Sequence, residues 1–324
     1  MQPRPAETVH HRHRRRARGA DPLPVHDPHT APRYERRSLY DGGTMRVVEL
    51  VARPHSAALG PTEQQTLNVL ALPLSGVFAR HRGTRQRVLA TPDHGLLLAA
   101  RVPYRVSFPG ALGDVCLMLG FSASGLAGLL PEAIARDGFD DRVFEDHALL
   151  PPAVVLGARC LHRRLRQGAD DDDALATEET VLALLAGALG AARRERRRPR
   201  TVGAFDPRAR LRPVERAKEA ITVQPEQPWT LQALAEVASV SPYHLAHAFR
   251  REVGTSLHQY VLRARLARAL DRVVGSEDDL TAVALDSGFS SHSHFTARFR
   301  AHFGVTPRAL RGTPRSVRTE AIDA

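Results

Sequence analysis

The chain is poor in cysteine and in tryptophan. Its 324 residues include two cysteines, Cys116 and Cys160, and one tryptophan, Trp229. Two cysteines cannot build a disulfide framework, and neither has another cysteine or a histidine at the spacing of a metal site. The disulfide-rich and zinc-finger classes are therefore excluded. We expect two buried thiols and a tryptophan that serves as a packing anchor.

Long hydrophobic runs are also lacking. No stretch reaches about 18 consecutive apolar residues, the length that a membrane-spanning helix requires. The Arg- and His-rich start, residues 1–19, has no apolar segment of the kind found in signal peptides. We therefore expect a cytoplasmic protein without a membrane partner.

Lysine is nearly absent, so arginine carries almost all of the positive charge. Lys218 is the only lysine in a chain whose net charge is +11. Such a charge favours a polyanionic partner, but much of it lies in two runs without periodic apolar residues, HHRHRRRARG and RRERRRPR. These runs predict a disordered basic arm over 1–33 and a linker over 201–212, with a C-terminal tail over 313–324.

Between the arm and the linker, residues 34–200 predict a β-rich domain followed by helices. Short β-type runs separated by Gly, Pro and Asp fill 34–122, as in a small antiparallel barrel or sandwich. From Ser124 the apolar spacing becomes helical, so the overall fold class is α+β. The last helical segment carries an apolar stripe that must pack on the barrel or on another subunit; it consists of Val181, Leu182, Leu185 and Leu189. The second alternative predicts a homodimer through residues 178–192.

Residues 213–312 predict two helix-turn-helix units. Thr230 opens one short helix, a turn follows at Ser239, and Ser241 caps a second helix. After a long connecting helix over 257–274 the design recurs, with Phe249-Arg250 and Gly254 repeated fifty residues later as Phe299-Arg300 and Gly304. The repeat indicates two related units.

Each second helix has one apolar and one polar face. Leu245 and Phe249 are four residues apart, as are Phe295 and Phe299, so each pair shares one helix face and belongs to a core. The opposite faces carry polar and basic side chains that point outward. A capped helix with such a face fits the major groove of DNA, which is about 12 Å wide.

The C-terminal region resembles the AraC/XylS family of transcriptional regulators. The matching residues are Leu231, Leu234, Ala235, Ser241, Leu245, Phe249, Gly254, Tyr260, Arg265, Ala269, Ala284, Gly288, Phe289, Phe295, Phe299, Gly304, Thr306, Pro307 and Arg311. The resemblance covers about a hundred residues and implies seven helices in two helix-turn-helix units, which bind promoter DNA and work with RNA polymerase. One departure is Ser239, where the family often has glycine, so we expect that turn to be either slightly strained or differently hydrogen-bonded.

The resemblance also implies which residues meet DNA. In the first unit they are Tyr243, His244, Ala246, His247 and Arg250, and in the second they are His292, Ser293, Thr296, Ala297 and Arg300. The small residues of the second set predict that the first helix discriminates more between bases. For Arg263, Arg265 and Arg268 on the connecting helix, intradomain ion pairs and phosphate contacts both remain open.

The β-rich region resembles the cupin-like sensor domains of the same family, which implies a small-molecule effector. Catalytic cupins bind a metal through an H-x-H pair and a glutamate, whereas His55, His81 and His94 here are scattered singly. A metalloenzyme is therefore disfavoured, and neither a metal nor another cofactor is expected. Phe78, His81, Arg101 and Tyr104 are the candidate effector-binding residues, although core, surface or loop roles would explain each of them.

Overall fold

A computed structural model describes residues 32–83, 86–123, 125–126, 144, 147–168, 174–197 and 207–312, with the backbone alone for 207–211. The predicted basic arm lies outside the described residues except for its last two positions. The C-terminal tail, most of the helical segment expected after Ser124 and positions 201–206 of the predicted linker lie outside them as well.

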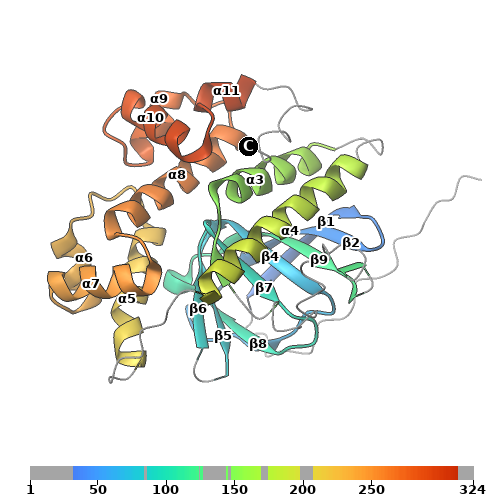
Figure 1. Ribbon diagram of the computed structural model, residues 1–324, viewed down its shortest axis with the longest axis horizontal. Coiled ribbons are helices and arrows are strands. Elements are labelled where there is room, and N and C mark those ends of the chain that lie inside the picture. The colour runs from blue at the N-terminus through green and yellow to red at the C-terminus, as the bar shows by residue number, and fades with distance from the viewer. Residues whose placement is uncertain are drawn as a thin grey trace, which may run out of the picture.

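The strands of the described chain form two antiparallel sheets (Figure 1). The six-stranded sheet has the order β1-β2-β9-β4-β7-β10, with β1 (Arg33–Asp41), β2 (Met45–Arg53), β9 (Asp114–Phe121), β4 (Asn68–Gly76), β7 (His94–Leu98) and β10 (His147–Leu149). The four-stranded sheet has the order β3-β8-β5-β6, with β3 (Thr62–Glu63), β8 (Tyr104–Ser107), β5 (Phe78–Arg82) and β6 (Gln86–Ala90). A 3₁₀ turn, η1 (Pro109–Ala111), precedes β9.

The sheets make an open sandwich rather than the closed barrel expected for a cupin-like domain. Among the described residues, no hydrogen-bonded pair of named strands joins one sheet to the other. The edge strand β3 has two residues, so it offers few backbone groups to β1 on the facing edge. A side-chain bond connects these edges instead, because the hydroxyl of Tyr34 donates to Glu63 Oε1 at 2.7 Å.

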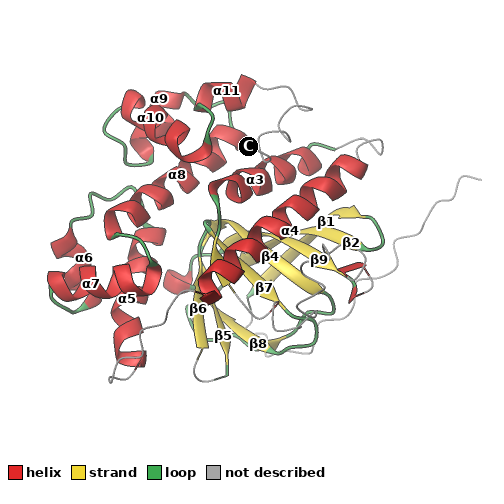
Figure 2. Ribbon diagram, viewed as in Figure 1, coloured by secondary structure: helices red, strands yellow, loops and turns green. Residues whose placement is uncertain are grey.

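Strand alternation divides the buried side chains of the sandwich between two clusters. The inter-sheet cluster lies between the sheets and contains Ala52, Val69, Ala71, Phe78, Ala90, Leu96, Leu98, Tyr104, Val106, Phe108 and Cys116. The residues that alternate with them on the six-stranded sheet, such as Val47, Leu117 and Leu119, pack in the cluster that contains the core residues of the helices α3 (Pro152–Arg166) and α4 (Ala174–Arg197). The domain therefore has three layers, with helices on one face only (Figure 2).

Helix α4 buries its apolar stripe inside the same chain. Val181, Leu185 and Leu189 are each at most 2% exposed, and Leu182 is partly buried. Packing within the chain, against α3 and β10, is therefore the alternative that the structure supports. The stripe does not require a second subunit, and the homodimer remains a prediction. By length and composition α4 could cross a membrane, but a mostly buried core helix meets the same criteria.

The C-terminal part consists of α5 (Pro207–Val223), α6 (Leu231–Ala238), α7 (Pro242–Val253), α8 (Leu257–Gly275), α9 (Leu280–Asp286), α10 (His292–Phe303) and α11 (Pro307–Gly312). Helix α5 begins six residues before the predicted domain boundary at 213. Pro213 consequently lies inside a helix rather than at its start.

The packing boundary of the C-terminal part runs through α8. The first-unit core contains residues of α5, α6, α7 and the start of α8, including Val214, Leu234, Phe249 and Tyr260. From Leu266 onward α8 packs with α9, α10 and α11 in the cluster that also contains residues of α3, α4 and the six-stranded sheet. We call this continuous cluster the shared core. Figure 1 shows α3 beside the second unit and the first unit at the other end of α8.

Ion pairs with one buried partner each reinforce the contact between the N-terminal domain and α8. Arg159 of α3 is 3% exposed and donates to Asp271 of α8 at 2.5 Å and to the carbonyl of Leu74 at 2.7 Å. Arg263 of α8 lies 3.3 Å from a carboxylate oxygen of Asp93 and donates to the carbonyl of Leu150 at 2.8 Å. Removing one partner of such a buried pair typically costs about 3–5 kcal/mol.

Candidate nucleic-acid interface

The first helix-turn-helix unit is built from α6, a tight turn and α7. The hydroxyl of Thr230 accepts from the amide of Ala233, and the hydroxyl of Ser241 accepts from the amide of His244, which confirms both predicted helix starts. Between the helices Ser239 adopts a left-handed conformation with φ 57°, while the amide of Val240 bonds back to Ala235. Of the two alternatives expected at this serine, the strained turn is therefore present.

The second unit, formed by α9, a turn and α10, repeats this geometry with glycine in the turn. Gly288 has φ 85°, and the amide of Phe289 bonds back to Ala284 as Val240 does to Ala235. A Cβ on Gly288 would lie 2.7 Å from the carbonyl oxygen of Glu226, which belongs to the loop before α6. Close packing and backbone conformation thus both require glycine here.

The predicted inner faces of α7 and α10 are buried. Leu245, Phe249, Phe295 and Phe299 are fully buried. Phe249 meets Tyr260 edge to face with centroids 5.3 Å apart, and Phe295 meets Phe299 in the same way at 5.4 Å. These contacts fix the rotation of both helices about their axes.

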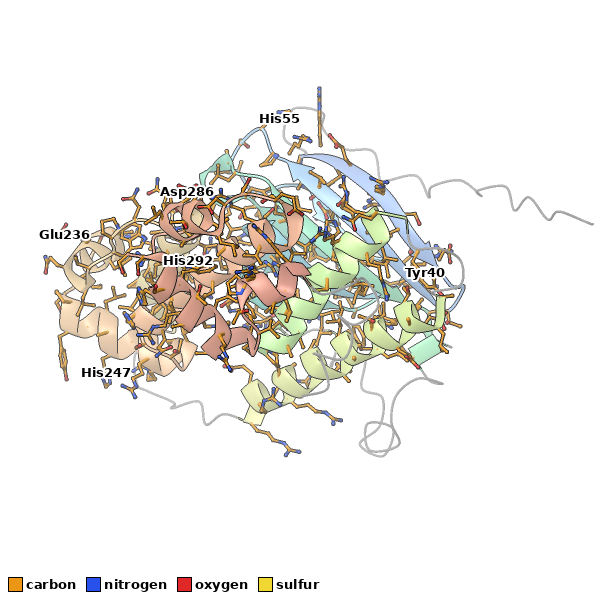
Figure 3. The ribbon with its side chains drawn as sticks, turned by 90° about the horizontal axis from the view of Figure 1, so that it is seen from above. Tyr40, His55, Glu236, His247, Asp286 and His292 are labelled. Atoms are coloured by element: carbon orange, nitrogen blue, oxygen red, sulfur yellow. The ribbon has the colours of Figure 1, made fainter. Side chains whose placement is uncertain are left out.

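The predicted DNA-contacting residues accordingly lie on the outer faces. Tyr243, His244, His247, Arg250, His292, Ser293, Ala297 and Arg300 are exposed, and Ala246 and Thr296 are half-buried. The ring of Tyr243 is 81% exposed and stacks on that of His247, with centroids 6.2 Å apart. In Figure 3 His247 of α7 and Glu236 of α6 lie at opposite edges of the first unit.

The arginines of α8 are held within the protein. Arg265 donates to the carbonyls of Pro225 and Gln227, both at 2.8 Å, and Arg268 bonds Glu226 at 2.8 Å. Arg265 and Arg268 therefore make contacts within the C-terminal part, as the first of the two alternatives predicts. Arg263 pairs with Asp93 of the N-terminal domain, which neither alternative anticipated.

Trp229 packs against the first-unit core, as expected of a packing anchor. Its indole donates to the carbonyl of Gln224 at 2.8 Å. The ring also borders a groove of about 680 Å³ between the two units, with Leu231, Val261 and Phe289 among its other lining residues. The two units therefore meet at Glu226 and Gly288 and are separated by this groove elsewhere along the same side of α8.

The candidate effector-binding residues do not form one group. Phe78 and Tyr104 belong to the inter-sheet cluster. His81 hydrogen-bonds Ser107 at 2.8 Å, and both residues alternate with the inward-facing ones, so His81 lies on the other face of the four-stranded sheet. Arg101 is an exposed loop residue with φ 61°. Of the four predicted residues, Phe78 and Tyr104 thus share one cluster, whereas His81 and Arg101 lie outside it, and the effector-binding role of each stays a prediction.

A polar group at the edge of the inter-sheet cluster was missed in the sequence. Besides the bond from Tyr34 to Glu63, it includes the hydroxyl of Tyr104, which accepts from Gln65. Asp114 is buried beside them, and burial together with the charge of Glu63 raises its pKa to about 8. An aspartate that starts an otherwise apolar strand was the one available signal. No group of three or more metal-ligating side chains occurs among the described residues.

Known proteins share similarity with the C-terminal part. Residues 234–313 match a family of helix-turn-helix domains. Over 92 residues the chain is 29% identical to an uncharacterized HTH-type transcriptional regulator of Haemophilus influenzae, covering 28% of this chain and 31% of that protein. Over 88 residues it is 30% identical to the multiple antibiotic resistance protein MarA of Escherichia coli, covering 27% of this chain and 69% of MarA.

A solved structure shows similarity over the same part. It is a transcriptional regulator from Chromobacterium violaceum with an AraC-type DNA-binding domain, 30% identical, with a TM-score of 0.31. The match covers 32% of this chain and 93% of that one. The chain thus spans less than a third of the first relative's length, 69% of MarA and 93% of the Chromobacterium violaceum chain.

Proposed function

Because the chain belongs to the AraC/XylS family, we propose that it is a sequence-specific DNA-binding regulator of transcription. The observation that carries the proposal is the pair of second helices, α7 and α10, whose apolar faces are buried while their polar faces stay uncovered. The 19 residues of α8 span about 28 Å at 1.5 Å per residue, close to the roughly 34 Å between successive major grooves. The helices α5 to α11 would be the seven-helix DNA-binding unit of the family.

The two second helices, α7 and α10, contribute unequally to sequence discrimination. Tyr243, Ala246 and His247 face base edges in one groove, and Ser293, Thr296 and Ala297 face those in the next. Alanine and threonine methyl groups contact only the thymine methyl, so α7 supplies most of the discrimination. Arg250 and Arg300 contact phosphates and give affinity without sequence preference.

Residues 34–200 act as a cupin-like sensor in this proposal. A small-molecule effector would bind between the sheets, where Phe78 and Tyr104 adjoin Glu63 and Asp114. Apolar walls with a few polar groups are typical of small-molecule sites. The regulator would work in the cytoplasm, as a homodimer, with RNA polymerase at the promoter.

Binding-site selection on the full-length chain tests the proposal. The chain is incubated with random duplexes, and the selected site is titrated by fluorescence anisotropy at several salt concentrations. We expect His247→Ala to relax the preference at one or two base pairs in one groove, at about 1–3 kcal/mol for a good base contact. Arg250→Ala and Arg300→Ala should weaken binding to every sequence and reduce the salt slope by about 0.9 each.

Arg46→Ala is the matched control, because Arg46 pairs with Asp41 on the exposed side of the sensor domain, away from α7 and α10. It should leave both the base preferences and the salt slope unchanged. A folded wild-type chain that selects no sequence would refute the proposed function. Unchanged preferences in His247→Ala would refute the role of His247.

A further inference from the structure

The hairpin of β5 and β6 has a different neighbour on each face. Phe78 and Ala90 pair across the strands and point into the inter-sheet cluster, where the effector is proposed to bind. Ala79 and Leu89 form the next pair and point the other way, as alternation along a strand requires. A displacement of the inner side chains therefore moves the backbone that carries the outer ones.

The outer face of this hairpin contacts α5, the helix that packs in the first-unit core beside α6 and α7. Val223, the last residue of α5, packs against Ala79 and Leu89. Arg87 of β6 reaches Glu215 at 3.1 Å and Glu219 at 3.2 Å. Glu215, Glu219 and Val223 are spaced four apart and form one stripe of α5, while Val214, Ala217 and Ile221 face the first-unit core.

This attachment is weak compared with that of the second unit. The side chain of Arg87 is 33% exposed, so water and salt screen its ion pairs. Arg159, by contrast, is buried between α3 and α8, and the shared core continues from the sensor domain into α10. The groove beside Trp229 separates the two units along part of α8.

The junction above the hairpin also contains a buried tyrosine. Tyr260 belongs to the first-unit core, and its hydroxyl lies near Thr91 and Asp93, which follow β6, and near Thr222 of α5. This side chain therefore adjoins both the segment after the hairpin and the helix that the hairpin contacts.

We propose that the hairpin of β5 and β6 is the coupling element between effector and DNA, and that it acts by moving the first helix-turn-helix unit against a second unit that is fixed to the sensor domain. A ligand between the sheets displaces the inner face, and the outer face then shifts α5 and with it α7. The spacing of the two recognition helices changes as a result. The effector part of this inference rests on the proposed function, whereas the difference in attachment does not.

Distance measurements between spin labels test the coupling without DNA or effector. Labels are placed in pairs at three exposed positions, Glu236→Cys in the first unit, Ala301→Cys in the second and Arg37→Cys in the sensor domain. The background is Cys160→Ala, because Cys116 is buried and will not react. The distances are then compared in the wild-type background and in Glu215→Gln/Glu219→Gln, which neutralises both partners of Arg87.

We expect both distances from position 236 to broaden and shift in the double variant, while the distance between 301 and 37 stays unchanged. Glu35→Gln is the control, since it neutralises the partner of Arg53 in an exposed ion pair elsewhere in the sensor domain. It should change none of the three distances. Raising the salt to about 1 M, where the screening length is about 3 Å, should reproduce the broadening in the unmutated chain and avoids any folding defect.

A separate variant tests whether the strands transmit a displacement from the inner face of the hairpin to its outer face. Phe78→Leu changes the inner face of β5 and should shift the distances from position 236, whereas Met118→Leu, in the same cluster but on β9, should not. Unchanged distances from position 236 in the double variant and at high salt would overturn the proposal. So would an equal change between 301 and 37, or no shift in Phe78→Leu. A chain that binds no DNA but gives the expected distances would refute the proposed function alone.

Discussion

Replacing Gly288 with alanine should destabilise the contact between the two helix-turn-helix units. The glycine has φ 85°, and a Cβ there would lie 2.7 Å from the carbonyl oxygen and 2.8 Å from the Cα of Glu226. Real Cβ atoms do not approach backbone atoms so closely. The loop before α6 must therefore move, or the turn before α10 must open.

Gly304→Ala supplies the matched control. Gly304 ends α10 with φ 77°, and no heavy atom lies within 4 Å of the Cβ that alanine would add. The free energy of unfolding of this variant should fall only by the cost of holding an alanine in the left-handed conformation, about 1–2 kcal/mol. For Gly288→Ala the free energy of unfolding should fall by that amount and by about a further 1–3 kcal/mol, because the added Cβ displaces the backbone of Glu226. The difference between the variants measures the packing of the second turn against the loop of the first unit.

Urea unfolding followed by tryptophan fluorescence is the assay. Trp229 is the only tryptophan and lines the same groove as Gly288, so its emission reports this part of the protein. We expect the midpoint for Gly288→Ala to fall well below that for Gly304→Ala with similar slopes. Equal midpoints for the two variants would show that the close approach to Glu226 does not contribute to stability.

Two predictions concern pH. The pKa of Asp114 is raised to about 8 by burial and by Glu63, so the folded chain retains a proton that the unfolded chain has lost above about pH 4. Stability should therefore fall as the pH rises from about 4 to 8, and Asp114→Asn should flatten that slope in urea unfolding; a slope that persists would contradict the assignment. Burial and the charge of Arg263 lower the pKa of His302 on α10 to about 4, which favours the neutral ring in the folded chain. Stability should be lost as the pH falls from about 6.5 to 4, and His302→Gln should reduce this loss, which thermal unfolding across that range would detect.

The DNA-binding half could be predicted from the sequence because its signals are local. Thr230 and Ser241 cap the helices whose starts they predict, and the four-residue spacing of Leu245 and Phe249 fixed the buried face of α7. The structure places the outward residues where that spacing requires. The start of α5 at Pro207 was missed, because basic residues and a proline gave the segment the composition of a linker.

The N-terminal half was less predictable because the positions of its side chains depend on pairing between distant strands. The placement of His81 on the opposite face from Phe78 could have been foreseen, because His81 is three residues after Phe78 and an odd offset along a strand leads to the opposite face. The contact of Arg263 with Asp93 could not be foreseen, since it joins positions 170 residues apart that meet only after the domains dock. The bond from Tyr34 to Glu63 has the same origin.

Composition and packing place the domain boundary at different points, and the difference matters for regulation. The sequence changes character before α5, where apolar periodicity stops, but the buried contacts change within α8, between Val261 of the first-unit core and Leu266 of the shared core. A cut at the compositional boundary would separate the second unit from α3 and would leave Asp271 without Arg159. The unit that can move independently is therefore not the whole DNA-binding domain but α5 to α7. Since α7 carries the aromatic and histidine side chains proposed to read bases, movement of this unit would change the element on which sequence discrimination depends.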